Sequence, residues 1–135
     1  MPELITPAAH AAALWVGLCL ILLLVLSVLV VRQRRRHEVA LGDGDVPELA
    51  RAIRAFGNAT EYVPGGLVAL LALALAGAQP LLIHAIGLVL FAGRVIHAVG
   101  LSRSGEASRA RATGVLLSWI AYLAAGVALL FYAIP

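Results

Sequence analysis

Four long apolar segments follow one another along this chain, with only short polar stretches between them. The first, residues 8–31, contains few polar side chains, among them His10 and Ser27. At about 1.5 Å per residue, a helix of that length exceeds the roughly 30 Å hydrocarbon core of a bilayer. Because lipid offers the backbone no hydrogen bonds, such segments cross it as helices. The chain is therefore predicted to be an all-α integral membrane protein.

The predicted architecture is a four-helix transmembrane bundle in a single domain, residues 1–135. A chain with 62% hydrophobic and 13% charged residues is too apolar for an ordinary soluble domain. The first segment is preceded by no basic residue and followed at once by arginines, so it is expected to be retained and not cleaved as a signal peptide. The second segment is long enough to cross the bilayer only when its polar first half is included. The predicted spans are about 8–31, 48–78, 81–101 and 108–134.

Arginine predicts the orientation in the membrane, because the chain contains no lysine and its 10 basic residues are all arginines. They lie between the first and second spans and around the loop between the third and fourth. The positive-inside rule then places both termini in the periplasm and both basic loops in the cytoplasm of a bacterial inner membrane. Topology and anionic lipid explain the net charge of +3 better than nucleic acid does. The lack of lysine, with abundant Ala, Arg and Leu, favours a bacterial source with a GC-rich genome.

Cysteine and histidine give no indication of a metal site. Cys19 is the only cysteine, in the middle of the first span, where a thiol is expected to pack as a small hydrophobic group. No cluster has the spacing of metal ligands, and Asp43-Gly44-Asp45 is too short for a calcium loop. We therefore expect no metal and no internal disulfide.

A stripe of polar residues on the second span is the first candidate for function. Arg54, Asn58, Glu61 and Tyr62 are spaced so that, at about 100° per residue, they share one helix face. Arg51 and Gly65 extend the same stripe. Ionised groups at membrane depth cost about 2.5–3.5 kcal/mol each on insertion scales, so this face needs a partner or a ligand.

Residues 51–64, which read RAIRAFGNATEYVP, resemble the second-helix signature of the MAPEG superfamily, the membrane-associated proteins in eicosanoid and glutathione metabolism. The four spans and the sequence RVIHAVG at residues 94–100 extend this resemblance. It implies a homotrimer of four-helix protomers. It also implies that glutathione, as co-substrate, binds between neighbouring subunits at the cytoplasmic side.

The resemblance transfers the glutathione-binding residues of the second helix to Arg54, Asn58, Glu61 and Tyr62. Their chemistry suits the ligand, since an arginine can bind a carboxylate with two hydrogen bonds, a glutamate can bind the ammonium, and an asparagine can bind peptide amides. Arg32 or Arg34 is expected to hold the second carboxylate. The full set expected at the glutathione site is Arg32, Arg34, Arg51, Arg54, Asn58, Glu61, Tyr62, Arg94 and His97.

Catalysis would require the thiolate of glutathione, because the thiolate is the nucleophile. Arg109 and Arg111 both resemble the thiolate-stabilising arginine of active members, and the sequence does not choose between them. A guanidinium in a partly dry site can lower a thiol pKa by about two units, or roughly 2.7 kcal/mol. Active members tend to carry tyrosines around positions 97 and 101, whereas this chain has His97 and Leu101. This departure disfavours chemistry like that of leukotriene synthases.

We therefore predict a glutathione transferase or peroxidase that acts on hydrophobic small molecules dissolved in the bilayer. Two alternatives remain at this stage. Arg54, Asn58 and Glu61 could form a polar network that fixes the trimer register without any ligand. The chain could instead be a small proton-coupled multidrug transporter with Glu61 as its proton site, although the two arginines on the same face would repel a cationic drug.

Overall fold

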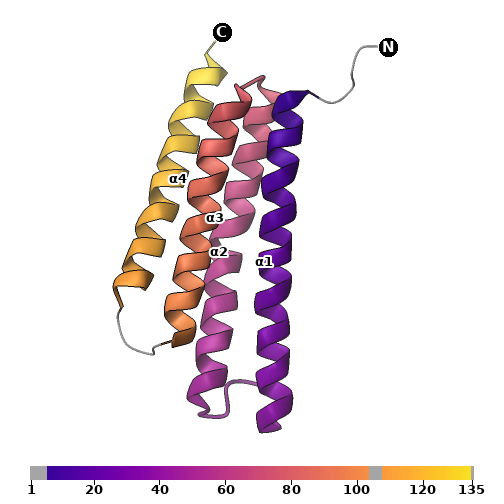
Figure 1. The fold of residues 1–135 in the computed structure, drawn as a ribbon, viewed down its shortest axis with the longest axis vertical. Coiled ribbons are helices and arrows are strands. Elements are labelled where there is room, and N and C mark those ends of the chain that lie inside the picture. Colours follow the sequence, from indigo (N-terminus) through magenta and orange to yellow (C-terminus); the bar gives the residue numbers. More distant parts are fainter. Residues whose placement is uncertain (1–5, 104–107, 135) are drawn as a thin grey trace.

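In a computed structural model, which describes residues 6–103 and 108–134, the chain forms four helices that run side by side (Figure 1). The described residues contain no strand. Each helix is long and apolar enough to cross a membrane, so the prediction of an all-α membrane fold with four spanning helices is confirmed. The predicted domain range of 1–135 includes residues 1–5, 104–107 and 135, which lie outside the described part. The helices are α1 (Pro7–His37), α2 (Pro47–Leu75), α3 (Pro80–Arg103) and α4 (Arg109–Ala133).

Helix α1 begins with a side-chain cap and continues beyond the predicted span. The Thr6 hydroxyl accepts a hydrogen bond from the backbone N–H of Ala9 at 3.2 Å, and Pro7 suits the first turn because its missing N–H needs no partner. The helix then includes the whole arginine run and ends at His37. Basic side chains stabilise this last turn through the negative end of the helix dipole.

The connection between α1 and α2 is a loop of residues 38–46 that Arg34 holds by hydrogen bonds. Gly42 and Gly44 adopt positive φ angles of 69° and 59°, a region that glycine enters without steric cost. The guanidinium of Arg34 donates hydrogen bonds to the carbonyl oxygens of Val39 at 3.4 Å and Gly42 at 2.9 Å. Arg34 therefore stabilises the loop from within its own chain.

Helix α2 continues unbroken through Pro64. Proline lacks the N–H that would bond the carbonyl of Thr60, so this carbonyl loses its usual intrahelical donor. The Thr60 hydroxyl donates to the carbonyl of Gly57 at 2.7 Å. The polar stripe and the apolar half of this segment thus belong to one continuous helix, as the sequence predicts.

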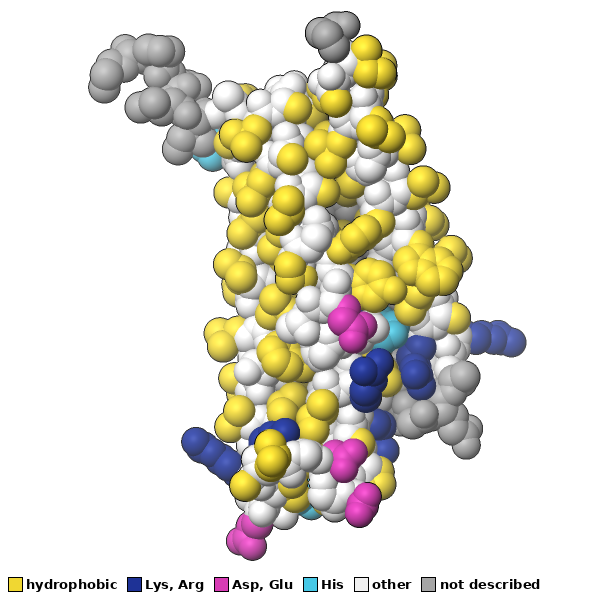
Figure 2. Space-filling model, turned by 180° about the vertical axis from the view of Figure 1, so that it is seen from behind, with side chains coloured by type: hydrophobic (Ala, Val, Ile, Leu, Met, Phe, Trp, Pro, Cys, Tyr) yellow, Lys and Arg dark blue, Asp and Glu magenta, His cyan; other side chains and the backbone are white. Residues whose placement is uncertain are grey.

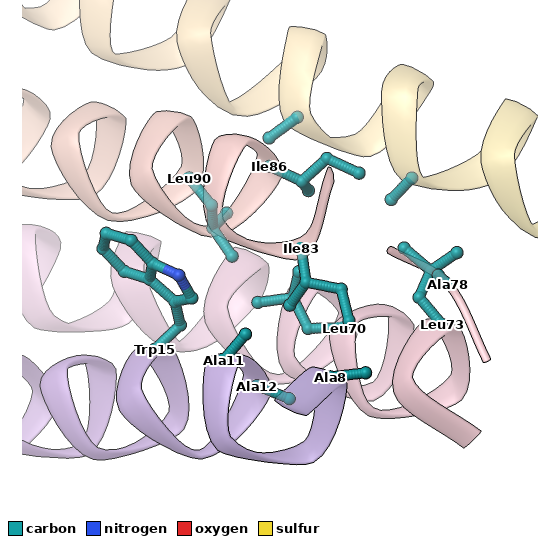
Figure 3. Close-up of a cluster of buried hydrophobic side chains, with 12 residues drawn as sticks. Ala8, Ala11, Ala12, Trp15, Leu70, Leu73, Ala78, Ile83, Ile86 and Leu90 are labelled. Carbon is teal, nitrogen blue, oxygen red and sulfur yellow. The ribbon is translucent and has the colours of Figure 1, made fainter. Parts of the chain in front are cut away.

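One end of the bundle, near both termini, holds an apolar core. Trp15 of α1, Leu70 of α2 and Ile83 of α3 meet there, together with small α1 residues that let the helices approach (Figure 3). Gly87 leaves room for the indole of Trp15, because a Cβ at this position would overlap the ring. Cys19 is fully buried, in agreement with the packing role expected from the sequence. We call this the apolar end.

Helices α3 and α4 pack closely through glycine. A Cβ on Gly114 would lie 2.6 Å from the backbone nitrogen of His97, and one on Gly93 would lie 3.0 Å from the carbonyl oxygen of Gly114. A larger residue at Gly114 would require the helices to separate, and one at Gly93 would require the neighbouring atoms to move by a few tenths of an ångström. This close approach brings Arg94 and His97 of α3 against the first turns of α4.

Candidate functional site

Charged side chains gather on the half of the bundle that carries the α1–α2 and α3–α4 connections (Figure 2). The other half of the same face is covered by hydrophobic side chains. We call the charged half the basic end. It contains the polar stripe of α2, the last turns of α3 and the first turns of α4.

A cavity of about 370 Å³ opens at the basic end between α2, α3 and α4. We call it the polar cavity. Three arginines from two helices line it, so a ligand there would meet a strongly positive surface. The lining residues are Pro47, Ala50, Arg51, Arg54, Asn58, His97, Leu101 and Arg111.

Arg94 lies beneath this cavity and is almost completely buried, with 1% of its surface exposed. Its guanidinium donates to Asn58 Oδ1 at 2.7 Å and to the carbonyl oxygen of Gly114 at 3.0 Å. Its carbon Cζ also lies 4.6 Å from the centre of the Tyr62 ring, a cation–π geometry. One buried cation therefore ties α2, α3 and α4 together.

No described carboxylate neutralises Arg94 directly. Within the two described ranges, an ion pair of 4.0 Å or less forms only between Arg51 and Glu48, at 3.3 Å. Asn58 instead links Arg94 to a carboxylate. Its Oδ1 accepts from Arg94, and its Nδ2 donates to Glu61 Oε2 at 3.2 Å. The Nε of Arg94 is buried and has no hydrogen-bond partner.

Tyr62 is the centre of an aromatic cluster beside this network. Its hydroxyl lies 3.3 Å from the indole Nε1 of Trp119, which donates to it. The hydroxyl of Tyr122 donates to the backbone carbonyl of Tyr62, and the two rings meet edge to face with centroids 5.9 Å apart. The cluster of Tyr62, Trp119 and Tyr122 thus joins α2 to α4.

A second hollow, of about 410 Å³, runs along the outside of α4. We call it the α4 groove. It shares His97 and Arg111 with the polar cavity, and its remaining wall becomes increasingly apolar toward Trp119. The residues that line it are His97, Ser108, Arg111, Ala112, Val115, Leu116 and Trp119. A polar ligand and an apolar one could therefore meet at the shared pair.

The structure gathers most of the residues predicted for the glutathione site. Four of them line the polar cavity: Arg51, Arg54, Asn58 and His97. Three more, Glu61, Tyr62 and Arg94, adjoin it through the Arg94–Asn58 hydrogen bond, the Asn58–Glu61 hydrogen bond and the ring of Tyr62. Arg111, one of the two arginines predicted to stabilise the thiolate, also lines the cavity.

Three predicted arginines lie elsewhere within this chain. Arg109 is exposed and lines neither the polar cavity nor the α4 groove, whereas Arg111 lines both. Arg32 is exposed on α1 and does not line these hollows either. Arg34 bonds the α1–α2 loop, as described above. The geometry thus separates Arg109 from Arg111, which the sequence could not.

Some residues of this region escaped the sequence analysis. Trp119 and Tyr122 lie in the apolar fourth helix, outside the predicted site, and both bond Tyr62. The carbonyl of Gly114 is a partner of Arg94, and a backbone acceptor leaves no signal in a sequence pattern. Gln33 of α1, with Arg51, lines a further cavity of about 160 Å³.

The described residues contain no group of three or more His, Cys, Asp or Glu that could hold a metal ion. The polar side chains in and beside the polar cavity instead carry guanidinium, amide, imidazole and phenol groups. Such groups bind organic anions and peptide amides through hydrogen bonds.

Comparison with known proteins gives concordant results. Residues 12–131 match the model of the MAPEG family. The chain is 40% identical over 121 residues to "Inner membrane protein YecN" of Escherichia coli (strain K12), an alignment that covers 90% of this chain and 91% of that protein. The protein of the same name from E. coli O6:H1 (strain CFT073 / ATCC 700928 / UPEC) matches with the same identity and coverage.

Proposed function

This chain belongs to the MAPEG family of membrane proteins, and from that premise we propose that it binds glutathione and acts as a glutathione transferase or peroxidase on hydrophobic electrophiles. The observation that carries the proposal is the convergence of Arg51, Arg54 and Arg111 on one cavity at the basic end. A tripeptide with two carboxylates needs two or more cationic partners, and a planar guanidinium binds each carboxylate with two hydrogen bonds.

The remaining groups of glutathione also find complementary partners. Glu61 lies one hydrogen bond from the cavity, through Asn58, and is exposed, so it can receive the ammonium group. Asn58 uses one amide hydrogen on Glu61 and its oxygen on Arg94, which leaves a second amide hydrogen for a peptide carbonyl. In this proposal Arg94 holds Asn58 in position and does not touch the ligand.

We assign the thiolate to the wall shared by the polar cavity and the α4 groove, where Arg111 and His97 lie. A guanidinium beside a thiol favours its ionised form. The apolar side of the groove would receive an electrophile from the bilayer, and holding both reactants there would convert a bimolecular reaction into an effectively unimolecular one. Arg111 is therefore our choice for the thiolate-stabilising residue, and Arg109 is not.

The proposal includes a homotrimer in the bacterial inner membrane, with the basic end cytoplasmic and both termini periplasmic. Arg54 and Glu61 are exposed on a helix that crosses the membrane, where contact with lipid would be costly. A neighbouring copy would cover them. Arg32, exposed on α1, could then reach the ligand of an adjacent subunit.

A second candidate function is supported by one observation. Asn58 already bonds both Arg94 and Glu61 within the chain, so the polar network holds together without a ligand. The network would then serve only to fix how helices and subunits meet. Glutathione binding distinguishes the two possibilities.

Calorimetric titration of the detergent-solubilised protein with glutathione tests the proposal. We expect saturable binding, and Arg54→Ala should weaken it by about 1.5–3 kcal/mol, or roughly 10- to 150-fold, since one charge-assisted pair is lost. Arg103→Ala is the matched control, because Arg103 is exposed and lines no part of the cavity. Absence of heat in a correctly assembled wild-type protein would favour the structural network.

A further inference from the structure

Another cavity lies between α2, α3 and α4, with Tyr122 of the aromatic cluster in its wall. Its volume is about 180 Å³. Tyr122 and Leu90 pack directly against the backbone at Gly65 and Gly66, and small residues make up most of the lining. These residues are Gly65, Gly66, Ala69, Ala121, Ala125 and Gly126.

The walls of this cavity offer a ligand almost no hydrogen bonding. The polar side chain among the lining residues belongs to Tyr122, and its hydroxyl already donates to the carbonyl of Tyr62. Leu90 and Leu129 supply much of the remaining wall. An apolar cavity of about 150 Å³ stays free of water and binds benzene, so a space of this size and chemistry suits a single uncharged ring.

The position of the cavity connects it to the polar network. The Tyr122 ring forms part of its wall and meets the Tyr62 ring edge to face. The Tyr62 ring in turn makes a cation–π contact with the Arg94 guanidinium. One pair of aromatic rings therefore separates an apolar space from a buried cation. Gly65 and Gly126 are exposed at its edge, which opens it toward the side of the bundle.

From these observations we infer that the space between α2, α3 and α4 is a binding site for an uncharged, benzene-sized apolar group. An occupant would gain dispersion contacts with walls that otherwise face a void. The identity of this occupant as the apolar part of an electrophile rests on the proposed function. The binding itself does not, since it depends only on the shape and chemistry of the cavity.

Glycine at position 126 makes the inference testable without disturbing the backbone. Gly126 lines the cavity, and a Cβ added to it would meet no atom within 4 Å, so this position accepts a side chain at the edge of the cavity. Gly17 of α1 offers the matched control, because a Cβ there also meets no atom within 4 Å and the residue lies outside the cavity. The same change, glycine to leucine, can therefore be made inside and outside the site.

The experiment is a titration of fluorobenzene, followed by fluorine NMR, into the protein held in lipid nanodiscs. We expect a saturable bound signal in the wild type and in Gly17→Leu, and an affinity at least tenfold weaker in Gly126→Leu. A signal that never saturates, or that is equal in both leucine variants, would mean that fluorobenzene only dissolves in lipid or that acyl chains fill the space. Either result overturns the inference.

Enlarging the cavity guards against a variant that merely fails to fold. Leu129→Ala removes part of the wall and should admit 1-fluoronaphthalene, which the wild type should bind poorly. A gain of binding cannot arise from unfolding, and no gain contradicts the site. A parallel glutathione titration separates the two proposals: fluorobenzene binding without glutathione binding supports the cavity and removes the proposed function, and the reverse result removes only the cavity.

Discussion

The two ends of this bundle are held together by different means. At the apolar end, Trp15, Leu70 and Ile83 pack apolar surface between three helices, with one hydrogen bond from Trp15 Nε1 to His84 Nδ1 at 3.2 Å, and small residues allow the close approach. At the basic end, a single buried guanidinium, Arg94, bonds two neighbouring helices and stacks on a tyrosine of one of them. The first arrangement depends on shape, and the second depends on a few directed contacts around a charge.

This difference between the two ends determines where the fold can accommodate a ligand. Carbon surfaces in close contact leave no unsatisfied group, whereas the basic end has a cavity of about 370 Å³ lined by Arg51, Arg54 and Arg111. Because water or a ligand can complete hydrogen bonds but cannot replace tightly packed carbon, we expect polar chemistry only at the basic end.

The largest effect on stability is expected for Arg94→Met. This change keeps the approximate length of the side chain but leaves Asn58 Oδ1 without its donor and removes the bond from Arg94 to the Gly114 carbonyl, which keeps only the Ser118 hydroxyl as a side-chain donor. We expect a loss of about 2–5 kcal/mol in the free energy of unfolding, measured by thermal or SDS denaturation in detergent micelles. Arg94→Lys, which keeps the charge, should recover part of it. Wild-type stability in Arg94→Met would contradict the view that a charge holds the basic end.

Leu70→Ala tests the apolar end and should cost somewhat less. Truncating a fully buried leucine leaves a cavity, and in soluble cores such changes cost about 2–5 kcal/mol. Lipid lacks the hydrophobic driving force of water, so we expect about 1–3 kcal/mol here. Glutathione affinity should not change, because the polar cavity lies at the other end. A large loss of affinity would mean that the two ends are coupled.

Gly114→Ala tests the contact between α3 and α4. The added methyl would lie 2.6 Å from the His97 nitrogen, so the helices must separate at a cost of about 1–3 kcal/mol. Gly126→Ala is the control on the same helix, where the methyl meets no atom within 4 Å. It should leave the midpoint of thermal unfolding unchanged or slightly raised. Equal destabilisation by both would show that helix α4 responds to any methyl group and not to the contact at His97.

Arg111→Ala tests the proposed chemistry, and its expected effect is the smallest. With Arg111 present, the thiol pKa of bound glutathione should lie below the ordinary value of about 8.5. Without it the pKa should rise by about one unit, so that turnover falls at neutral pH and recovers as pH rises and the thiol ionises unaided. Thiolate absorbance against pH measures this directly. Arg109→Ala should leave the curve unchanged, and a shift in that variant alone would reverse our assignment.

The sequence predicts the fold of this chain well and its polar site less completely. Four hydrophobic segments and the stripe from Arg51 to Tyr62 follow directly from length and helical periodicity. Periodicity cannot tell whether Arg94 faces a ligand or the interior, because that depends on how α2 and α4 pack against α3. It also cannot distinguish Arg109 from Arg111, whose different positions follow from where α4 begins after its Ser108 cap.

The buried position of Cys19 has a chemical consequence for a protein that handles glutathione. Exposed thiols near glutathione are readily converted to mixed disulfides, a reversible modification that adds a charged tripeptide to the protein. Cys19 is the only cysteine of the chain and has no exposed surface. The folded protein is therefore protected against capture by its own proposed co-substrate. A thiol-specific reagent added to the native complex would then titrate bound glutathione without a background from the polypeptide.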